Sequence, residues 1–148
     1  MIIEVTGSAV PRLTRRDVTT FVRRVLLALR KDEDITNVSI AFVDDEAMKG
    51  LNRKFRHKSK TTDVLTFPAD DSCEIVISID EARRQATDER HSIATEVRYL
   101  LLHGLLHAAG YDHETDDGEM NTLELKLRRD VGLDQASVQV PHRGTTTR

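Results

Sequence analysis

Apolar residues recur along the chain with two different spacings, and each spacing predicts one kind of element. Between Thr14 and about Arg30 they recur three and four positions apart, which is typical of a helix with one buried face, and Thr14 can cap its start. From Asn37 to Val43 apolar and polar residues alternate, which predicts a strand with one buried face. The N-terminal part of the chain therefore contains both helix and strand.

The rest of the chain continues this mixture without a regular alternation of strand and helix. Further strands are expected at Ile2 to Thr6, Val64 to Phe67 with Pro68 as its stop, and Glu74 to Ile79. Further helices are expected from the caps Asp44, Asp80, Ser92 and Asp116 to about Phe55, Asp88, Ala109 and Gly132. The pattern predicts an α+β fold, a small mixed four-stranded sheet covered by helices. It does not specify the order of the strands.

Length and composition indicate one globular domain. The chain has 148 residues, of which 39% are apolar and 32% are charged, so it can form a single core but is too short for two domains. We expect this domain to span residues 1–133. Residues 134–148 contain Pro141 and end in Gly144 to Arg148 without apolar periodicity, which predicts a flexible C-terminal tail.

The N-terminus and the cysteine content bear on location and on metal chemistry. An acid at position four and the lack of a long apolar run argue against secretion and membrane insertion, so a cytoplasmic protein is expected. Cys73 is the only cysteine, which excludes an internal disulfide and a cysteine-rich zinc site. We expect Cys73 to act as a small, partly buried apolar residue. Any metal must be bound through histidine, aspartate or glutamate.

Three histidines have the spacing of metal ligands. His103 and His107 are four residues apart on a predicted helix, so their side chains lie on one face about one turn apart. Gly110 can end this helix and reverse the chain, which would bring His113 back toward the pair. Three protein ligands with an open fourth position are typical of a catalytic zinc. The spacing predicts one zinc ion per chain; the alternative is a set of core or surface histidines.

The residue after the first histidine distinguishes this motif from that of the metzincin proteases, which has the same offsets. In those proteases a glutamate at this position is the general base, whereas this chain has Gly104. Glycine cannot accept a proton, so peptide hydrolysis becomes less favoured while zinc binding is unaffected. Glu96 lies near the ligand face and is a candidate for assisting a water, although an exposed acid is expected there. Asp63 and Asp112 are weaker candidates for accepting a hydrogen bond from a ligand histidine.

A cluster of cations precedes the strand at Val64. Five cations fall within eight residues, with one phenylalanine and one histidine between them: Arg53, Lys54, Phe55, Arg56, His57, Lys58 and Lys60. Such a segment can neutralise phosphates and stack on bases, or it can be a solvated charged loop. The net charge of −3 argues against a general attraction to nucleic acid, so the position of these cations decides the question.

Three blocks of residues resemble the endoribonuclease YbeY family. They are Leu51 to Arg56 leading through Thr62 to Pro68, then Glu74 to Ser78, and then His103 to His113, within a stretch from about Val38 to Leu133. The resemblance implies a zinc-dependent endoribonuclease that cleaves single-stranded RNA and acts in 16S rRNA 3′ end maturation and ribosome quality control. It also implies that Arg56 is catalytic, and that the partners are the 16S rRNA precursor, the small ribosomal subunit and assembly factors.

Two other functions remain open from the residues alone. One is a zinc-dependent peptide or amide hydrolase whose base comes from elsewhere in the chain. The other is a ribosome-assembly binding module with a structural zinc. The general base of a phosphodiesterase is also left open among a metal-bound water, a substrate 2′-hydroxyl and Glu96.

Overall fold

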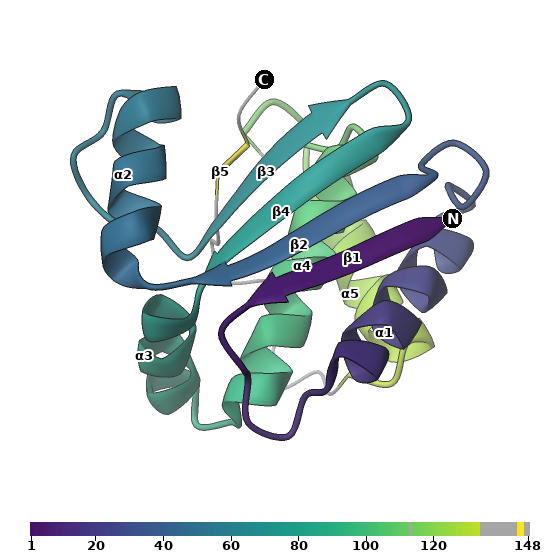
Figure 1. The fold of residues 1–148 in the computed structure, drawn as a ribbon. Helices are drawn as coiled ribbons and strands as arrows, with labels where there is room; N and C mark the ends of the chain where they lie inside the picture. Colours follow the sequence, from purple (N-terminus) through teal and green to yellow (C-terminus); the bar gives the residue numbers. More distant parts are fainter. Residues whose placement is uncertain (113, 134–144, 147–148) are drawn as a thin grey trace.

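The fold is built on a mixed sheet whose strand order differs from the order in the sequence (Figure 1). The computed structural model describes residues 1–112, 114–133 and 145–146. Its main strands are β1 (Ile2–Gly7), β2 (Asn37–Val43), β3 (Val64–Ala69) and β4 (Ser72–Ser78), in the spatial order β1-β2-β4-β3. The β1–β2 and β2–β4 pairs are parallel and the β3–β4 pair is antiparallel. The predicted mixed four-stranded sheet is confirmed, and a two-residue strand, β5 (Thr145–Thr146), adds to it beside β3.

Five helices accompany the sheet in the described residues. They are α1 (Arg15–Ala28), α2 (Asp45–Arg56), α3 (Ile79–Glu89), α4 (Ile93–Ala108) and α5 (Glu119–Asp130). Each of the predicted caps Thr14, Asp44 and Ser92 accepts a hydrogen bond from a backbone N–H in the first turn of its helix. The α+β class predicted from the pattern is thereby confirmed.

Some predicted boundaries were wrong. The cap of α3 is Ser78 and not Asp80, because the Ser78 hydroxyl accepts from the N–H of Glu81 at 3.2 Å. Pro68 lies inside β3 and does not stop it, since β3 lies toward the edge of the sheet, where a missing N–H is tolerated. The capping box predicted for α5 is replaced by an N-cap at Gly118, with a positive φ of 101°. Asp116 instead accepts from the N–H of Met120 at 2.9 Å.

The sheet separates two apolar clusters. On one face Ile75 and Ile77 of β4 belong to the main core, which includes buried residues of α1, α4 and α5; Figure 1 shows α4 and α5 behind the sheet. Between them Val76 joins Met48 of α2 and Leu65 of β3 in a smaller cluster. Successive strand residues point to opposite faces, so α2 packs on the side opposite the main core. Cys73 is also buried in the main core, where burial raises the pKa of its thiol to about 11.

Helix α4 lies close against the sheet because residue 104 has no side chain. A Cβ atom at Gly104 would lie 3.1 Å from Oγ1 of Thr66 and 3.2 Å from two side-chain atoms of Ile75. Glycine inside a helix costs about 1 kcal/mol relative to alanine, and here the close packing of helix on sheet explains its presence. This contact turns the Gly104 side of α4 toward the sheet and so sets the direction of its neighbours His103 and His107.

No helix within the described ranges has both the length and the apolar character needed to cross a membrane.

Candidate active site

Two of the three predicted zinc ligands meet inside the protein. His103 and His107 lie one turn apart on α4 and are each 3% exposed. Their Nε2 atoms are 3.1 Å apart, and the ring planes are inclined at 78°. His113 lies outside the described residues, so its position as the third ligand stays a prediction. The structure therefore brings together the pair that the four-residue spacing predicted.

The geometry of this pair fits a common metal ion. Two nitrogens bound to one tetrahedral zinc at roughly 2.0–2.1 Å lie about 3.3 Å apart, close to the 3.1 Å between the two Nε2 atoms. Two imidazole nitrogens are also the donor set that zinc prefers when cysteine is absent. The two residues can thus hold a zinc ion, with further ligands completing the site.

A buried acid that the sequence analysis did not single out contacts the first of these histidines. Oε1 of Glu124 on α5 lies 3.2 Å from Nδ1 of His103, and Glu124 is 1% exposed. Nη2 of Arg128 donates to Oε2 of Glu124 at 3.0 Å, and Arg128 is also buried. A signal was present in the sequence, because Glu124 is a charged residue between the apolar positions Met120 and Leu127 on the buried face of α5.

A second group of possible metal ligands lies at the start of α4. One ligand atom from each of Glu89, His91 and Glu96 lies within 4.8 Å of the others. The expectation that Glu96 is exposed was wrong: it is fully buried, and its Oε1 lies 2.7 Å from Nε2 of His91. Among the described residues this is the group of three possible ligands that the structure assembles. It is a mixed carboxylate and imidazole set, not the three histidines predicted.

The predicted catalytic arginine lines a polar pocket of about 380 Å³. Arg56 is the last residue of α2, and it shares this pocket with Lys58 and Lys60 of the following loop. Glu114, which follows His113 in the chain, lines the same pocket. The fold thus brings Arg56 and the segment beside the third predicted ligand to one cavity, although Asp63 and Glu81 make its lining mixed in charge.

Cations of this cluster line two pockets, and Lys60 and Thr61 belong to the lining of both. Arg53 lines the second pocket, of about 770 Å³, together with Lys60 and with acidic residues at the start of α2. The ammonium of Lys54 lies 5.2 Å from the ring centre of Phe55, and Phe55 packs edge-on against Phe67. Only three of the five cations, Arg56, Lys58 and Lys60, therefore line the cavity described above.

Two buried polar side chains hold the loop 57–63, which carries Lys58 and Lys60. The amide of Asn52, which is 1% exposed, donates to the backbone carbonyl of Lys60 at 2.8 Å. At the far end Asp63 accepts from its neighbour's N–H and, at 3.0 Å, from Nε2 of Gln85 on α3. Asp63 therefore anchors the loop to α3, and none of its hydrogen bonds in the described residues goes to a ligand histidine.

Asp112 was the other aspartate considered as a hydrogen-bond acceptor for a ligand histidine. Its Oδ1 accepts from the backbone N–H of Glu114 in a turn.

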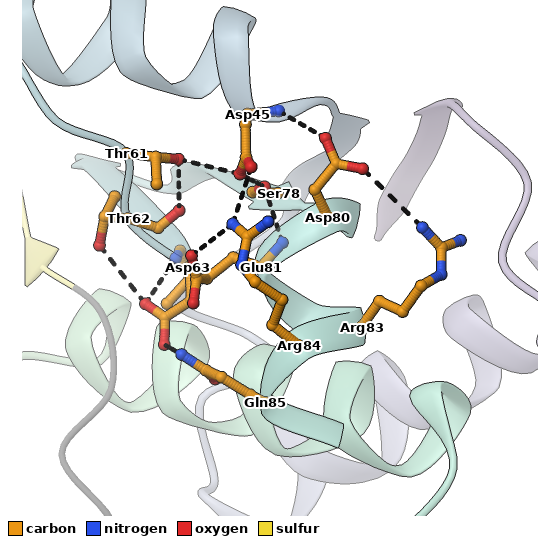
Figure 2. Close-up of polar contacts among 11 residues, drawn as sticks. Asp45, Thr61, Thr62, Asp63, Ser78, Asp80, Glu81, Arg83, Arg84 and Gln85 are labelled. Carbon is orange, nitrogen blue, oxygen red and sulfur yellow. Dashed lines mark hydrogen bonds and ion pairs between the residues drawn. The ribbon is translucent and has the colours of Figure 1, made fainter. Parts of the chain in front are cut away.

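Asp45 is the centre of a hydrogen-bond network that joins this loop to the strands and to α3 (Figure 2). Its Oδ1 accepts from Ser78 at 2.9 Å and from Thr61 at 3.2 Å, and its Oδ2 accepts from Arg84 at 2.7 Å. Burial alone would raise the pKa of Asp45, but these hydrogen bonds outweigh it and hold the pKa below its usual value. The network links the start of α2, the end of β4 and residue 61 of the loop 57–63, here called the basic loop.

The chain is similar in sequence and in fold to proteins of a known family. A family model described as Endoribonuclease YbeY matches residues 6–132. The endoribonuclease YbeY of Nautilia profundicola is 46% identical over 110 residues, which cover 71% of this chain and 77% of that protein. The one from Koribacter versatilis is 44% identical over 105 residues, which cover 69% of each. A solution structure of a Thermotoga maritima protein matches with a TM-score of 0.64 at 26% identity, covering 88% of this chain and 89% of that one.

Proposed function

This chain belongs to the YbeY endoribonuclease family, and from that premise we propose that it is a zinc-dependent endoribonuclease. Its substrate is single-stranded RNA, and its role is 16S rRNA 3′ end maturation and ribosome quality control in the cytoplasm. The resemblance to the family supports the choice of substrate, of the small ribosomal subunit and its assembly factors as partners, and of this setting. The observation that carries the proposal is the buried pair of imidazoles on α4, whose Nε2 atoms are 3.1 Å apart.

In this proposal His103, His107 and His113 hold one zinc ion. The Nε2–Nε2 distance matches a shared tetrahedral ion. When bound, zinc supplies a Lewis acid that polarises a phosphate oxygen and stabilises negative charge. The mixed group at Glu89, His91 and Glu96 is the rival location, because carboxylate and imidazole also bind divalent metals.

Arg56 is proposed to bind the phosphate that is cleaved. Its guanidinium is always charged and planar, so it can contact two phosphate oxygens at once and stabilise charge that grows in the transition state. Lys58 and Lys60 line the same pocket and attract the RNA backbone as point charges. Gly104 offers no side chain to act as a base, and Glu96 pairs with His91. We therefore assign the general base to neither position.

Cleavage of a single-stranded RNA by zinc-loaded, chelated and His107→Ala protein tests the proposal, with bound zinc measured in each sample. We expect about one zinc per chain and cleavage only in the zinc-loaded parent protein, since one remaining α4 imidazole holds zinc weakly. His91→Ala is the matched control, because it removes a histidine of the rival group and should leave zinc and cleavage unchanged.

Three results would contradict the proposal. Full zinc content in a His103→Ala, His107→Ala double variant would place the metal elsewhere. Chelator-sensitive cleavage of peptides without cleavage of RNA would favour the amide hydrolase. RNA binding without cleavage by zinc-loaded, folded protein would favour an assembly module with a structural metal.

A further inference from the structure

We propose that Glu124 is a positioning residue for the zinc ligand His103, and that Arg128 holds Glu124 in place. The inference rests on the proposed zinc site and adds two residues of α5 to it. Helices α4 and α5 meet at these residues: Oε1 of Glu124 lies 3.2 Å from Nδ1 of His103, and both side chains are buried.

Two residues one helical turn away, Arg128 on α5 and Tyr99 on α4, hold the carboxylate of Glu124 in its orientation. Glu124 and Arg128 are four residues apart on α5, as Tyr99 and His103 are on α4. The guanidinium of Arg128 donates to Oε2 of Glu124 at 3.0 Å and lies over the ring of Tyr99, 4.3 Å from its centre. Both oxygens of Glu124 therefore have a named partner, and the carboxylate cannot turn away from His103 without giving up Arg128.

The chemistry of imidazole makes this contact relevant to the metal. A carboxylate can only accept a hydrogen bond, so it favours the form of His103 with its proton on Nδ1. In neutral imidazole that leaves the lone pair on Nε2, the atom that faces Nε2 of His107 at 3.1 Å. A ligand histidine usually donates its other ring N–H to such an acceptor, which orients the ring and makes it more basic.

Stability alone does not account for a buried ion pair at this place. Met120, Leu127 and Val131 occupy neighbouring buried positions of α5 and its C-cap, so an apolar residue at 124 would suit the core. Replacing a buried ion pair with apolar residues of similar volume is often neutral or stabilising. A role in holding a ligand gives a physical reason for a charged pair where packing favours an apolar one.

Four variants of the full chain test the inference: Glu124→Gln, the double variant Glu124→Met with Arg128→Met, His103→Ala, and Glu96→Gln as a control. Glu96→Gln is matched, because it removes another buried carboxylate that pairs with a histidine, at a shorter distance of 2.7 Å. The double variant removes both charges together, so that it folds even if Glu124→Gln leaves Arg128 unpaired and unfolds the chain. Zinc affinity is measured by competition with a chelator, and the thermal midpoint of each metal-free protein is recorded.

We expect the Glu124 variants to bind zinc about 10- to 100-fold more weakly than the parent protein. Glu96→Gln should bind zinc as tightly as the parent, and the metal-free double variant should melt at or above the parent's temperature. The absorption spectrum of cobalt-substituted protein should also shift in the folded Glu124 variants, because the ring of His103 is no longer held.

Parent-like zinc affinity and cobalt spectrum in the double variant would overturn the inference, because the ligand would then need no support from α5. That failure is distinct from failure of the proposed site, which shows as unchanged zinc binding in His103→Ala. A loss of zinc confined to Glu96→Gln would move the metal to the group of Glu89, His91 and Glu96, and would also overturn the inference.

Discussion

Gly104 stands where metzincin proteases have their general base, and it is packed against the sheet. The sequence shows that the usual base is missing, and the structure adds that this position faces the sheet. The atoms nearest to a Cβ at residue 104 belong to Thr66 and Ile75, at 3.1–3.2 Å. A side chain here would enter the packed layer between α4 and the sheet, so the position is unsuited to a glutamate acting as general base.

We therefore predict that Gly104→Glu destabilises the protein by about 3 kcal/mol or more and does not create a protease, because it overpacks the core and buries a charge. Denaturant unfolding and a peptide-cleavage assay check this. Gly50→Glu is the control, since Gly50 is also inside a helix but has nothing within 4 Å of a Cβ. It should change stability by less than about 1 kcal/mol. Efficient peptide cleavage by a stable Gly104→Glu protein would show that only the base was missing.

Arg56 is the residue for which catalysis and attraction of RNA must be separated. Arg56→Ala should keep its zinc and its fold but lose most RNA cleavage, and Arg56→Lys should restore little, because lysine lacks the planar pair of donors. Lys58→Ala is the comparison, since Lys58 is exposed in the same pocket. It should weaken binding modestly, and less so at high salt.

The measurement for Arg56 is the cleavage rate at saturating RNA, at which lost affinity no longer limits turnover. Zinc content is determined for each variant in parallel. If saturating RNA restores the Arg56→Ala rate to that of the parent, Arg56 only binds substrate and the catalytic assignment is wrong.

At the scale of elements, Asp45 connects three segments that are far apart in the sequence. It begins α2, accepts from Ser78 at the end of β4, and pairs with Arg84 of α3. Ser78 serves the same junction twice, because its hydroxyl also accepts from the N–H of Glu81 as the cap of α3. The basic loop joins this junction through the hydroxyl of Thr61. Asp45 therefore adds to the contacts of Asn52 and Asp63 that hold this loop.

We predict that Asp45→Asn lowers the free energy of unfolding by about 1 kcal/mol at pH 7, a modest value because the network is partly exposed and screened by solvent. The folded pKa of Asp45 lies below its ordinary value, so its contribution is present above about pH 4 and is lost as the pH falls through the folded pKa. Denaturant unfolding at pH 7 and at pH 3 measures both proteins. An equal difference at the two pH values would contradict the role of the charge.

At the scale of the whole molecule, the main core is built from apolar residues of several helices and strands. The main core combines buried apolar residues of α1, α4 and α5 with those of β2 and β4. Two of the predicted zinc ligands, His103 and His107, are also buried on α4. A structural zinc site in a small domain usually replaces such a core. A core of this kind favours a catalytic role for the proposed zinc over a structural one.

Removal of zinc with a chelator should therefore leave the secondary structure intact and lower the thermal midpoint. Ligand at about 100 times its Kd stabilises the native state by about 2.7 kcal/mol, which sets the expected scale of the shift. Far-UV circular dichroism and thermal unfolding, with and without chelator, measure it, and added zinc should reverse the change. Collapse of the far-UV signal on chelation would show that the metal holds the fold together.

Sequence alone determined the features of this protein that depend on neighbours along the chain. The helices and strands follow from residue spacing, and the caps Thr14, Asp44 and Ser92 act within one turn. The pairing of His103 and His107 was predictable for the same reason, because four residues on a helix bring two side chains to one face. The assignment of His113 as the third ligand stays a prediction.

Tertiary structure decided the features that depend on packing between distant segments. Three such features are the strand order, the contact of buried Glu96 with His91, and the contact of Glu124 with His103. The spacing of these residues in the sequence carries no periodic signal for them. A charged residue in an apolar stripe indicates that some partner exists, but only the arrangement of the helices shows which one. For the same reason, the pocket that joins Arg56 to Glu114 could be seen only once α2 and the segment after α4 had been placed on the sheet.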